Sequence, residues 1–380
     1  MTSDPGSAVL VPVAVLVLLS LVAWGRSAPS LLGFGLAVFC AFAGLAAARS
    51  FLPDELFWPN SPVAQRARWA VRHLAKDPGW ESRPVFILLG SSATNFGLDH
   101  EMLEKLLAER GTPATVISFA MIGQTHLERR YALETFLRLL GEEGRAKLAS
   151  AKVTLLHEIF DAYDRHPLYR FEKEAFTERY IQFLNPANAC RGWKAYEAQL
   201  ASEPQLPRWS VAALLAHHAL LNQFAVGSFS DMKWPGERKR IDRTFLALER
   251  PETGFDYART VEVWKNSPPR SERVADASMP YEQWSRSIDD INEVMLPYAD
   301  EVGFFALPVL EPERAHYAED FALALNDPQS PVWYVPSAED MEGLMSGELW
   351  FDAVHPTAAG AVKFTEIFAR CLRDVHPAEN

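Results

Sequence analysis

The stretch "RPVFILLGSS", residues 83–92, indicates the fold class of this chain. Its residues 85–89 form a continuous apolar run, rich in branched side chains, that ends at Gly90. This pattern is typical of a strand that is buried on both faces. The sequence "LDHEMLEKLLAERG", residues 98–111, follows with helical spacing and a terminal glycine. Together the two segments predict the first strand and the first helix of an α/β domain.

The alternation of strand and helix continues along the chain. Further strands are predicted over residues 114–121, 152–160, 301–310 and 331–337, and further helices over 125–141, 281–300 and 357–372. Such alternation favours a doubly wound, mostly parallel sheet, here of five strands. Residues 162–280 interrupt the pattern with aromatic residues, prolines and helical stretches but no clear strand. We therefore predict a helical insertion at about 162–280 within this domain.

Composition restricts the possible functions. The chain has 380 residues, of which 48% are hydrophobic and 23% charged, so most of it is expected to fold as a globule. Its formal net charge of −12 gives no basic surface for nucleic acid. Three cysteines are too few for a disulfide framework. His217 and His218 have no cysteine or carboxylate at ligand spacing nearby, so we expect no metal site and no cofactor.

Two uncharged apolar segments occupy the N-terminal region, residues 7–24 and 30–48. A helix of that length spans roughly 28 Å, about the thickness of a bilayer core. The alternative is a signal peptide followed by a buried helix, but the first seven residues carry an acid and no base. The pattern therefore predicts a transmembrane hairpin over 1–49, a connector over 50–83 and a catalytic domain over 84–380.

The charged residues around this hairpin favour opposite orientations. Two spans return the chain to the side of its N-terminus, and Arg26 between them favours a cytoplasmic turn. Opposing this are basic residues that follow the second span: Arg49, Arg66, Arg68 and Arg72. We expect an inner-membrane protein whose catalytic domain is extracytoplasmic, an orientation that rests on the chemistry below more than on charge.

Two serines follow the first strand. Gly90-Ser91-Ser92 lies at the carboxyl end of that strand, where ligands bind in sheets of this kind. A turn there exposes a hydroxyl, and the next helix offers free backbone N–H groups. The alternative is that the serines only cap a helix or form a tight turn.

An aspartate and a histidine three residues apart precede the last predicted helix, in "LWFDAVHPTAAGA", residues 349–361. His355 is a suitable base for a serine hydroxyl, and Asp352 is suited to orient the imidazole and stabilise its protonated form. The spacing lets both side chains reach one site from one loop. The alternative is that Asp352 caps the helix and that His355 is a surface imidazole.

Gly90-Ser91-Ser92 and Asp352-x-x-His355 resemble the first and last motifs of the SGNH, or GDSL-like, hydrolase superfamily. The resemblance covers residues 84–161 and 281–372 and implies a flavodoxin-like α/β sheet. By this alignment Ser92, not Ser91, is the nucleophile. The Gly-Ser-Ser variant with membrane spans ahead of it looks like the membrane-anchored branch that O-acylates envelope polymers, as in teichoic-acid D-alanylation and alginate O-acetylation.

The family's middle motifs are matched less well. The second motif supplies an oxyanion-hole glycine, and Gly123 after the second strand is the candidate beside the Ser92 N–H; its alternative is a simple strand–helix turn. The third motif, Gly-x-Asn-Asp, is missing, and His157 and Glu158 stand in its region. His157 is either a third oxyanion donor or a buried histidine of the core.

The resemblance implies a membrane-anchored O-acyltransferase that forms a seryl acyl-enzyme and passes an acyl group, acetyl being the expected one, to an extracytoplasmic glycan. It also implies an acylated donor and a multispanning membrane acyltransferase as partner. One alternative is an esterase or deacetylase that acts on acylated glycans. Another is a catalytically silent SGNH-like scaffold in a membrane acylation complex, which the missing third motif leaves open.

Overall fold

The computed structural model describes seven stretches of the chain: residues 62–159, 182–200, 208–223, 247–267, 281–312, 315 and 332–375. The chain divides into two compact units. One comprises Met1–Gln65 and Arg170–Arg240, and the other Arg66–Tyr169 and Ile241–Asn380. The sheet and the candidate site lie in the second unit.

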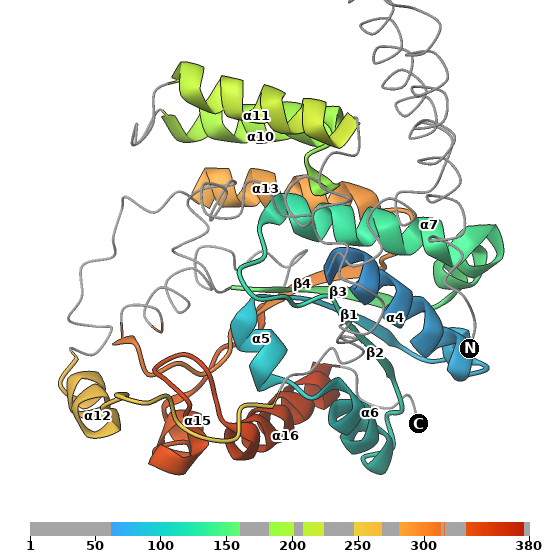
Figure 1. Cartoon of the computed structure of the whole chain (residues 1–380). Coiled ribbons are helices and arrows are strands. Elements are labelled where there is room, and N and C mark those ends of the chain that lie inside the picture. The colour runs from blue at the N-terminus through green and yellow to red at the C-terminus, as the bar shows by residue number, and fades with distance from the viewer. Residues whose placement is uncertain are drawn as a thin grey trace, which may run out of the picture. The chain divides into compact units, whose positions relative to one another are not determined.

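A five-stranded parallel sheet forms the centre of this unit (Figure 1). The strands are β1 (Val85–Leu89), β2 (Thr115–Ser118), β3 (Val153–Glu158), β4 (Glu301–Phe305) and β5 (Val332–Tyr334), in the order β2-β1-β3-β4-β5. Every pair of neighbours is parallel, which confirms the predicted sheet. All five residues of β1 are buried, as its apolar run indicated. The order is the flavodoxin-like one, with its switch point beside β1.

Helices cover both faces of the sheet, as a doubly wound fold requires (Figure 1). α7 (His126–Ser150) and α13 (Tyr281–Met295) lie on one face, and α6 (His100–Glu109) and α16 (Ala358–Val375) lie on the other. The hydrophobic core on the α6–α16 side joins residues of all five strands to both helices. Because parallel strands bury both faces, their apolar runs need helices on each side.

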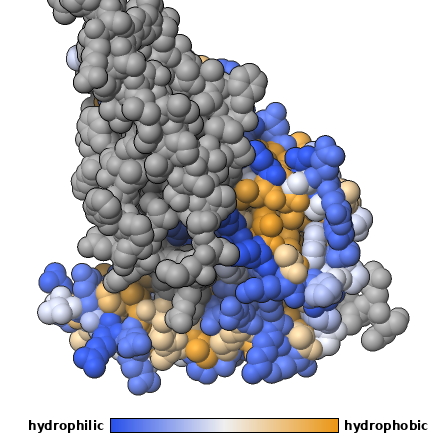
Figure 2. Space-filling view, turned by 45° about the vertical axis from the view of Figure 1, so that its right-hand side comes forward, coloured by the Kyte–Doolittle hydropathy of each residue, from blue (hydrophilic) through white to orange (hydrophobic). Residues whose placement is uncertain are grey.

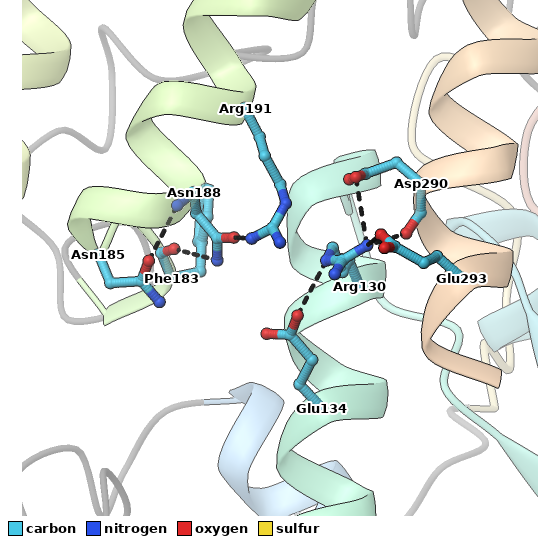
Figure 3. Close-up of polar contacts among 8 residues, drawn as sticks. All are labelled: Arg130, Glu134, Phe183, Asn185, Asn188, Arg191, Asp290 and Glu293. Carbon is cyan, nitrogen blue, oxygen red and sulfur yellow. Dashed lines mark hydrogen bonds and ion pairs between the residues drawn. The ribbon is translucent and has the colours of Figure 1, made fainter. Parts of the chain in front are cut away.

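Arg130 ties α7 to α13 (Figure 3). Its side chain is 7% exposed and pairs with Glu134 at 2.8 Å, Asp290 at 3.2 Å and Glu293 at 3.0 Å, and it donates to the Asp290 carbonyl oxygen. A buried guanidinium needs such partners, because leaving it unpaired costs several kcal/mol. The contact holds α13 along α7, above the strand that carries His157.

The helix predicted over residues 125–141 is longer in the structure. α7 begins with a capping box between Thr125 and Glu128 and is interrupted at Gly141, whose φ of 72° lies in the left-handed region that glycine tolerates. Helical backbone then continues to Ser150. The glycine therefore marks a break within α7. From the sequence pattern alone, such a break cannot be distinguished from the end of the helix.

The predicted insertion over 162–280 contains three described helices: α10 (Pro186–Leu200), α11 (Arg208–Gln223) and α12 (Tyr257–Lys265). The described residues of this range include no strand. α10 and α11 pack together within the first unit, where Asn188 donates to the Phe183 carbonyl (Figure 3). α12 belongs to the unit that holds the sheet. That residues 162–280 form one insertion within the domain remains a prediction.

The predicted membrane spans, 7–24 and 30–48, lie outside the described residues. None of the helices that the structure describes is both long enough and apolar enough to cross a bilayer. The described part of the predicted connector contains α4 (Pro62–Lys76) and a 3-10 turn, η1 (Trp80–Ser82). On the face drawn in Figure 2, an apolar patch lies beside hydrophilic side chains, and further apolar areas lie among hydrophilic ones lower on the same face.

Candidate active site

The nucleophile candidate lies in the turn between β1 and α5 (Ser92–Gly97). Ser91 caps this short helix, because its hydroxyl oxygen accepts the Ala93 N–H at 3.1 Å. Ser91 is buried, whereas Ser92, the first helical residue, is partly exposed. The turn therefore buries one hydroxyl in a structural role and leaves the other accessible to a reactant.

Asp352 and His355 lie in a short closed loop ahead of α16. The Phe351 N–H donates to the His355 carbonyl at 2.9 Å, and an isolated bridge pairs Trp350 with Pro356. The Leu310 N–H donates to the Ala353 carbonyl at 2.7 Å, which attaches the loop to the segment after β4. These bonds fix the loop backbone, so the positions of both side chains are set before any substrate arrives.

His355 connects Ser92 to Asp352. Its Nε2 lies 2.8 Å from the Ser92 Oγ, and its Nδ1 lies 2.7 Å from an Asp352 carboxylate oxygen. The ring of Phe96 packs edge-on against the imidazole, with centroids 5.2 Å apart. The three predicted catalytic residues therefore meet in the order that a serine nucleophile, a base and an orienting carboxylate require.

The Asp352 carboxylate is held in its ionised form. Burial by itself would raise the pKa of Asp352, but the hydrogen bond and charge of His355 lower it. The N–H groups of Val354 and His355, which donate at 2.8 and 2.7 Å to its other oxygen, lower it further. The net pKa lies below the usual value of 3.8. A charged carboxylate therefore stands behind the imidazole at neutral pH.

The alternative for this motif, a helix cap and a surface imidazole, does not fit the contacts. The Thr357 hydroxyl accepts the Gly360 N–H at 3.3 Å in the first turn of α16. Asp352 uses its oxygens on its own loop and on His355 instead. The His355 side chain is only 22% exposed.

Gly123 stands in the turn after β2, at the same edge of the sheet as Ser92. Its φ is 59°, a left-handed conformation. The Met121 N–H donates to the Gly90 carbonyl at 3.3 Å, so the turn after β2 lies against the turn after β1. This neighbourhood suits an oxyanion-hole donor, and that role for Gly123 stays a prediction.

His157 is fully buried near the end of β3. Its Nε2 lies 2.8 Å from the Asn292 Oδ1 of α13. Successive strand residues point to opposite faces, so His157 faces away from the side to which its neighbour Glu158 points. Burial lowers the pKa of His157 to about 3, against a smaller opposite effect of the Asn292 hydrogen bond. This environment fits a buried histidine of the core. None of the contacts described for His157 supports the alternative role of an oxyanion donor.

Two polar contacts beside the nucleophile were not predicted. Glu158 accepts hydrogen bonds from the residues on either side of Ser92. Arg66 of α4 donates to the Asn95 Oδ1, one helical turn beyond Ser92. The only sequence signal for Glu158 was a carboxylate at a strand end, and nothing in the local pattern indicates that Arg66 reaches α5.

Among the described residues, no group of three or more His, Cys, Asp or Glu side chains could hold a metal ion. His218 has its Nδ1 2.9 Å from the Leu214 carbonyl oxygen of its own helix. The expectations of no metal and no cofactor remain predictions. What the site does supply is an accessible hydroxyl, an imidazole and a carboxylate in line, which is the equipment of nucleophilic acyl transfer.

No family model matches this chain, and no curated protein and no solved structure shows significant similarity to it.

Proposed function

We propose that this chain is a Ser-His-Asp acyl-transfer enzyme of SGNH type, in which Ser92 forms a covalent acyl-enzyme. The observation that carries the proposal is the bridging position of His355, 2.8 Å from Ser92 and 2.7 Å from Asp352. The hydrogen-bonded order of the three groups argues against the alternative of a catalytically silent scaffold, because a scaffold gains nothing from a partly exposed hydroxyl aligned on an imidazole.

In the first half of the reaction, the Ser92 Oγ attacks the carbonyl carbon of an acyl donor while His355 Nε2 removes the hydroxyl proton. Asp352 accepts a hydrogen bond from the Nδ1–H, stays ionised and stabilises the imidazolium. The negative charge that develops on the carbonyl oxygen needs backbone N–H donors, for which Ser92 and Gly123 are the proposed pair. When the tetrahedral intermediate collapses, the imidazolium gives its proton to the leaving group and the acyl group stays on Ser92.

In the second half, His355 Nε2 removes a proton from the acceptor, whose oxygen attacks the acyl carbon. The bond from that carbon to the Ser92 Oγ then breaks, and the imidazolium returns its proton to the serine oxygen. A sugar hydroxyl gives transfer, and water gives hydrolysis. We propose transfer to a glycan, with acetyl as the acyl group, because the Gly90-Ser91-Ser92 form of the motif and the apolar segments ahead of it resemble the envelope-polymer O-acyltransferases. An esterase or deacetylase uses the same three side chains, so the choice rests on which acceptor reaches the acyl-enzyme.

The covalent intermediate provides the test. We expect mass spectrometry of the chain, quenched after mixing with p-nitrophenyl acetate, to find one acetyl group, on the peptide that contains Ser92. The Ser92→Ala variant should carry none, and Ser91→Ala should still be acetylated. Adding candidate glycans should then divide the acyl group between glycan and free acetate, which separates transfer from hydrolysis. Acetylation of Ser92→Ala equal to that of the wild type would refute the proposal.

We further propose that residues 1–49 anchor the enzyme in the inner membrane, with the catalytic domain outside and Arg26 inside. A multispanning acyltransferase would then supply the acyl group across the bilayer. Alkaline phosphatase fused after residue 380 becomes active only where its disulfides form, and we expect an active fusion. An inactive phosphatase fusion together with a fluorescent cytoplasmic-type reporter at the same point would place the domain inside and remove the envelope acceptor.

A further inference from the structure

Glu158 is the last residue of β3, and its carboxylate lies beneath the turn that carries the nucleophile. The register pairs Leu89 of β1 with His157, so Glu158 lies level with Gly90 and the start of the turn. The side chain is fully buried: the residue is 1% exposed. No step of the mechanism above uses this group.

Three donors from the turn converge on this carboxylate. The Ser91 N–H donates to Oε2 at 2.5 Å and the Thr94 hydroxyl donates to the same oxygen at 2.7 Å. The Ser91 hydroxyl lies 3.2 Å from Oε1. Ser91 directly precedes Ser92, and Thr94 follows it by two residues. The carboxylate therefore holds the chain on both sides of the nucleophile.

The bonds also orient the Ser91 hydroxyl. A serine hydroxyl has one proton to donate. Here it points at Glu158, so that a lone pair faces the Ala93 N–H, 3.1 Å away. The cap of α5 and the carboxylate are thus coupled through Ser91, and the backbone of the first helical residue, Ser92, is fixed between them.

Gly90 is required by the same close packing. A Cβ at this position would come within 2.3 Å of the Thr94 Oγ1 and within 2.7 Å of the Glu158 Oε2. The carboxylate occupies the space that a side chain would need. The glycine of the motif is thus explained by the approach of Glu158 and Thr94 as well as by the turn.

Burial raises the pKa of Glu158. The Ser91 N–H, the Thr94 hydroxyl and the charge of Arg129 lower it, but burial is the largest effect and the net pKa is raised. The N–H of Ser91 can only donate a hydrogen bond, so Oε2 must remain an acceptor whether Glu158 is ionised or protonated. A protonated Oε1 can still donate to the Ser91 oxygen. The hydrogen bonds, rather than the charge, are the property that the turn depends on.

We propose that Glu158 is a positioning residue for the nucleophile: it holds Ser91 and Thr94 so that the Ser92 Oγ stays in hydrogen-bonding reach of His355. The inference rests on the proposed serine nucleophile. It assigns a role in the region where the resemblance finds no third motif. Glu158 acts through its neighbours and touches no reacting atom.

The test compares Glu158→Gln with Glu158→Met in the full-length chain. Glutamine has an oxygen for the two Oε2 bonds and an amide that can donate to the Ser91 oxygen, whereas methionine has a similar length, no oxygen and only a weakly accepting sulfur. The readout is the rate at which a small fluorophosphonate labels Ser92, with Ser92→Ala as the blank. We expect Gln to stay within about tenfold of the wild type, as for one weakened hydrogen bond, and Met to be about 10²-fold slower, as for a misplaced reacting group.

Glu104→Met is the matched control. Glu104 also accepts a backbone N–H, from Val116 at 2.7 Å, but it joins α6 to β2 away from the site. We expect it to lower the melting temperature without slowing the labelling. If Glu158→Met behaves in the same way, Glu158 is merely structural and the proposal is wrong. Loss of labelling in Glu158→Gln as large as in Glu158→Met would also overturn it, because the charge would then be essential.

Crystal structures separate this proposal from the proposed function. If the wild type is not labelled at all, Ser92 is not reactive and the proposed function fails. The positioning role is then decided by the separation of Ser92 Oγ and His355 Nε2. It should be near 2.8 Å in the wild type and in Glu158→Gln, and beyond hydrogen-bonding reach in Glu158→Met. An unchanged separation in Glu158→Met overturns the inference.

Discussion

Ser91 and Ser92 are adjacent and have different partners. Ser91 is enclosed by Glu158 and the Ala93 N–H, whereas Ser92 faces His355. The backbone turn between β1 and α5 separates the two hydroxyls, so their chemical roles follow from their positions rather than from their residue type.

Replacing each serine by alanine should separate these roles. We expect Ser92→Ala to lower the rate of ester hydrolysis by about 10⁴–10⁶-fold, the loss found when a triad member is removed, with little change in stability. Ser91→Ala should retain activity to a larger degree but lower the free energy of unfolding by about 1 kcal/mol through loss of a helix cap. Steady-state kinetics and urea unfolding measure both. Wild-type activity in Ser92→Ala would refute the assignment.

Asp352 should make stability depend on pH at the acidic end. Its folded pKa lies below 3.8, so it contributes stability that is present above the unfolded pKa and is lost as the pH falls through the folded value. We expect Asp352→Asn to be less stable than the wild type at pH 7 and this difference to shrink towards pH 3. Urea unfolding at both pH values measures it. A difference that grows on acidification would contradict the assigned direction.

The same substitution should slow catalysis strongly. An asparagine in this position favours the wrong imidazole tautomer, which in another serine enzyme lowers kcat by about 10⁴-fold. We expect a loss of similar size for Asp352→Asn, measured with the ester assay. A folded variant with nearly full activity would show that His355 does not depend on Asp352.

At the scale of elements, two of the helices that the structure describes begin with capping boxes in different surroundings. Thr125 and Glu128 begin α7 next to the Gly123 turn, and Thr125 is fully buried. Ser337 and Asp340 begin α15 (Ala338–Gly343), and Ser337 is exposed. The two motifs make the same pair of hydrogen bonds, so any difference between the effects of removing them comes from their surroundings.

Removing each cap tests whether the turn after β2 takes part in catalysis. Thr125→Ala and Ser337→Ala should each cost about 0.5–2 kcal/mol of stability. Only Thr125→Ala should also lower kcat, by up to about 10²-fold, because the cap fixes the turn that presents the Gly123 N–H. Melting temperatures and ester kinetics measure the two effects. Equal kcat in both variants would argue against an oxyanion donor in this turn.

At the scale of the whole molecule, three of the histidines that the structure describes in the unit with the sheet are buried. Burial is the main cause that lowers the pKa of His100 and His157 to about 3 and that of His126 well below 6.5. The charge of Arg129 adds to the effect on His126 and His157. All three are therefore neutral in the folded chain at neutral pH.

These histidines should make the fold sensitive to mild acid. For a base whose folded pKa is lowered, stability is present above the unfolded pKa of about 6.5 and is lost as the pH falls towards the folded value. Each group contributes a slope of up to about 1.4 kcal/mol per pH unit in that window. The raised pKa values of Glu158 and Glu301 act in the opposite direction, but three groups outweigh two.

Urea unfolding between pH 7 and pH 5 measures this slope. We expect the free energy of unfolding of the wild type to fall steadily as the pH falls. His100→Gln should reduce the slope of the free energy of unfolding with pH by the equivalent of about one proton taken up on unfolding. This expectation holds whatever the substitution does to the stability at pH 7. An identical slope in His100→Gln and the wild type would show that His100 does not stay neutral in the folded chain.

The sequence by itself determined the strands and the local half of the site. Short apolar runs rich in branched residues, such as residues 85–89, predict buried strands, because a strand tolerates them only when both of its faces are covered. The pairing of Asp352 with His355 spans three residues of one closed loop, so the spacing, together with the resemblance to an Asp-x-x-His motif, was enough to predict it. Strand ends were predicted too long at 114–121 and 301–310, since apolar residues continue past the last paired positions, Ser118 and Phe305.

Only the tertiary structure decided which distant groups meet. Ser92 and His355 are 263 residues apart, and they join because α16 packs against α5 and α6 on one face of the sheet and carries the Asp352–His355 loop to the end of β1. The contact of Glu158 with Ser91 spans 67 residues and depends on β3 being the neighbour of β1. Neither follows from local pattern, because strand order and helix packing are set by the whole core, where each element is placed by surfaces far away in the sequence.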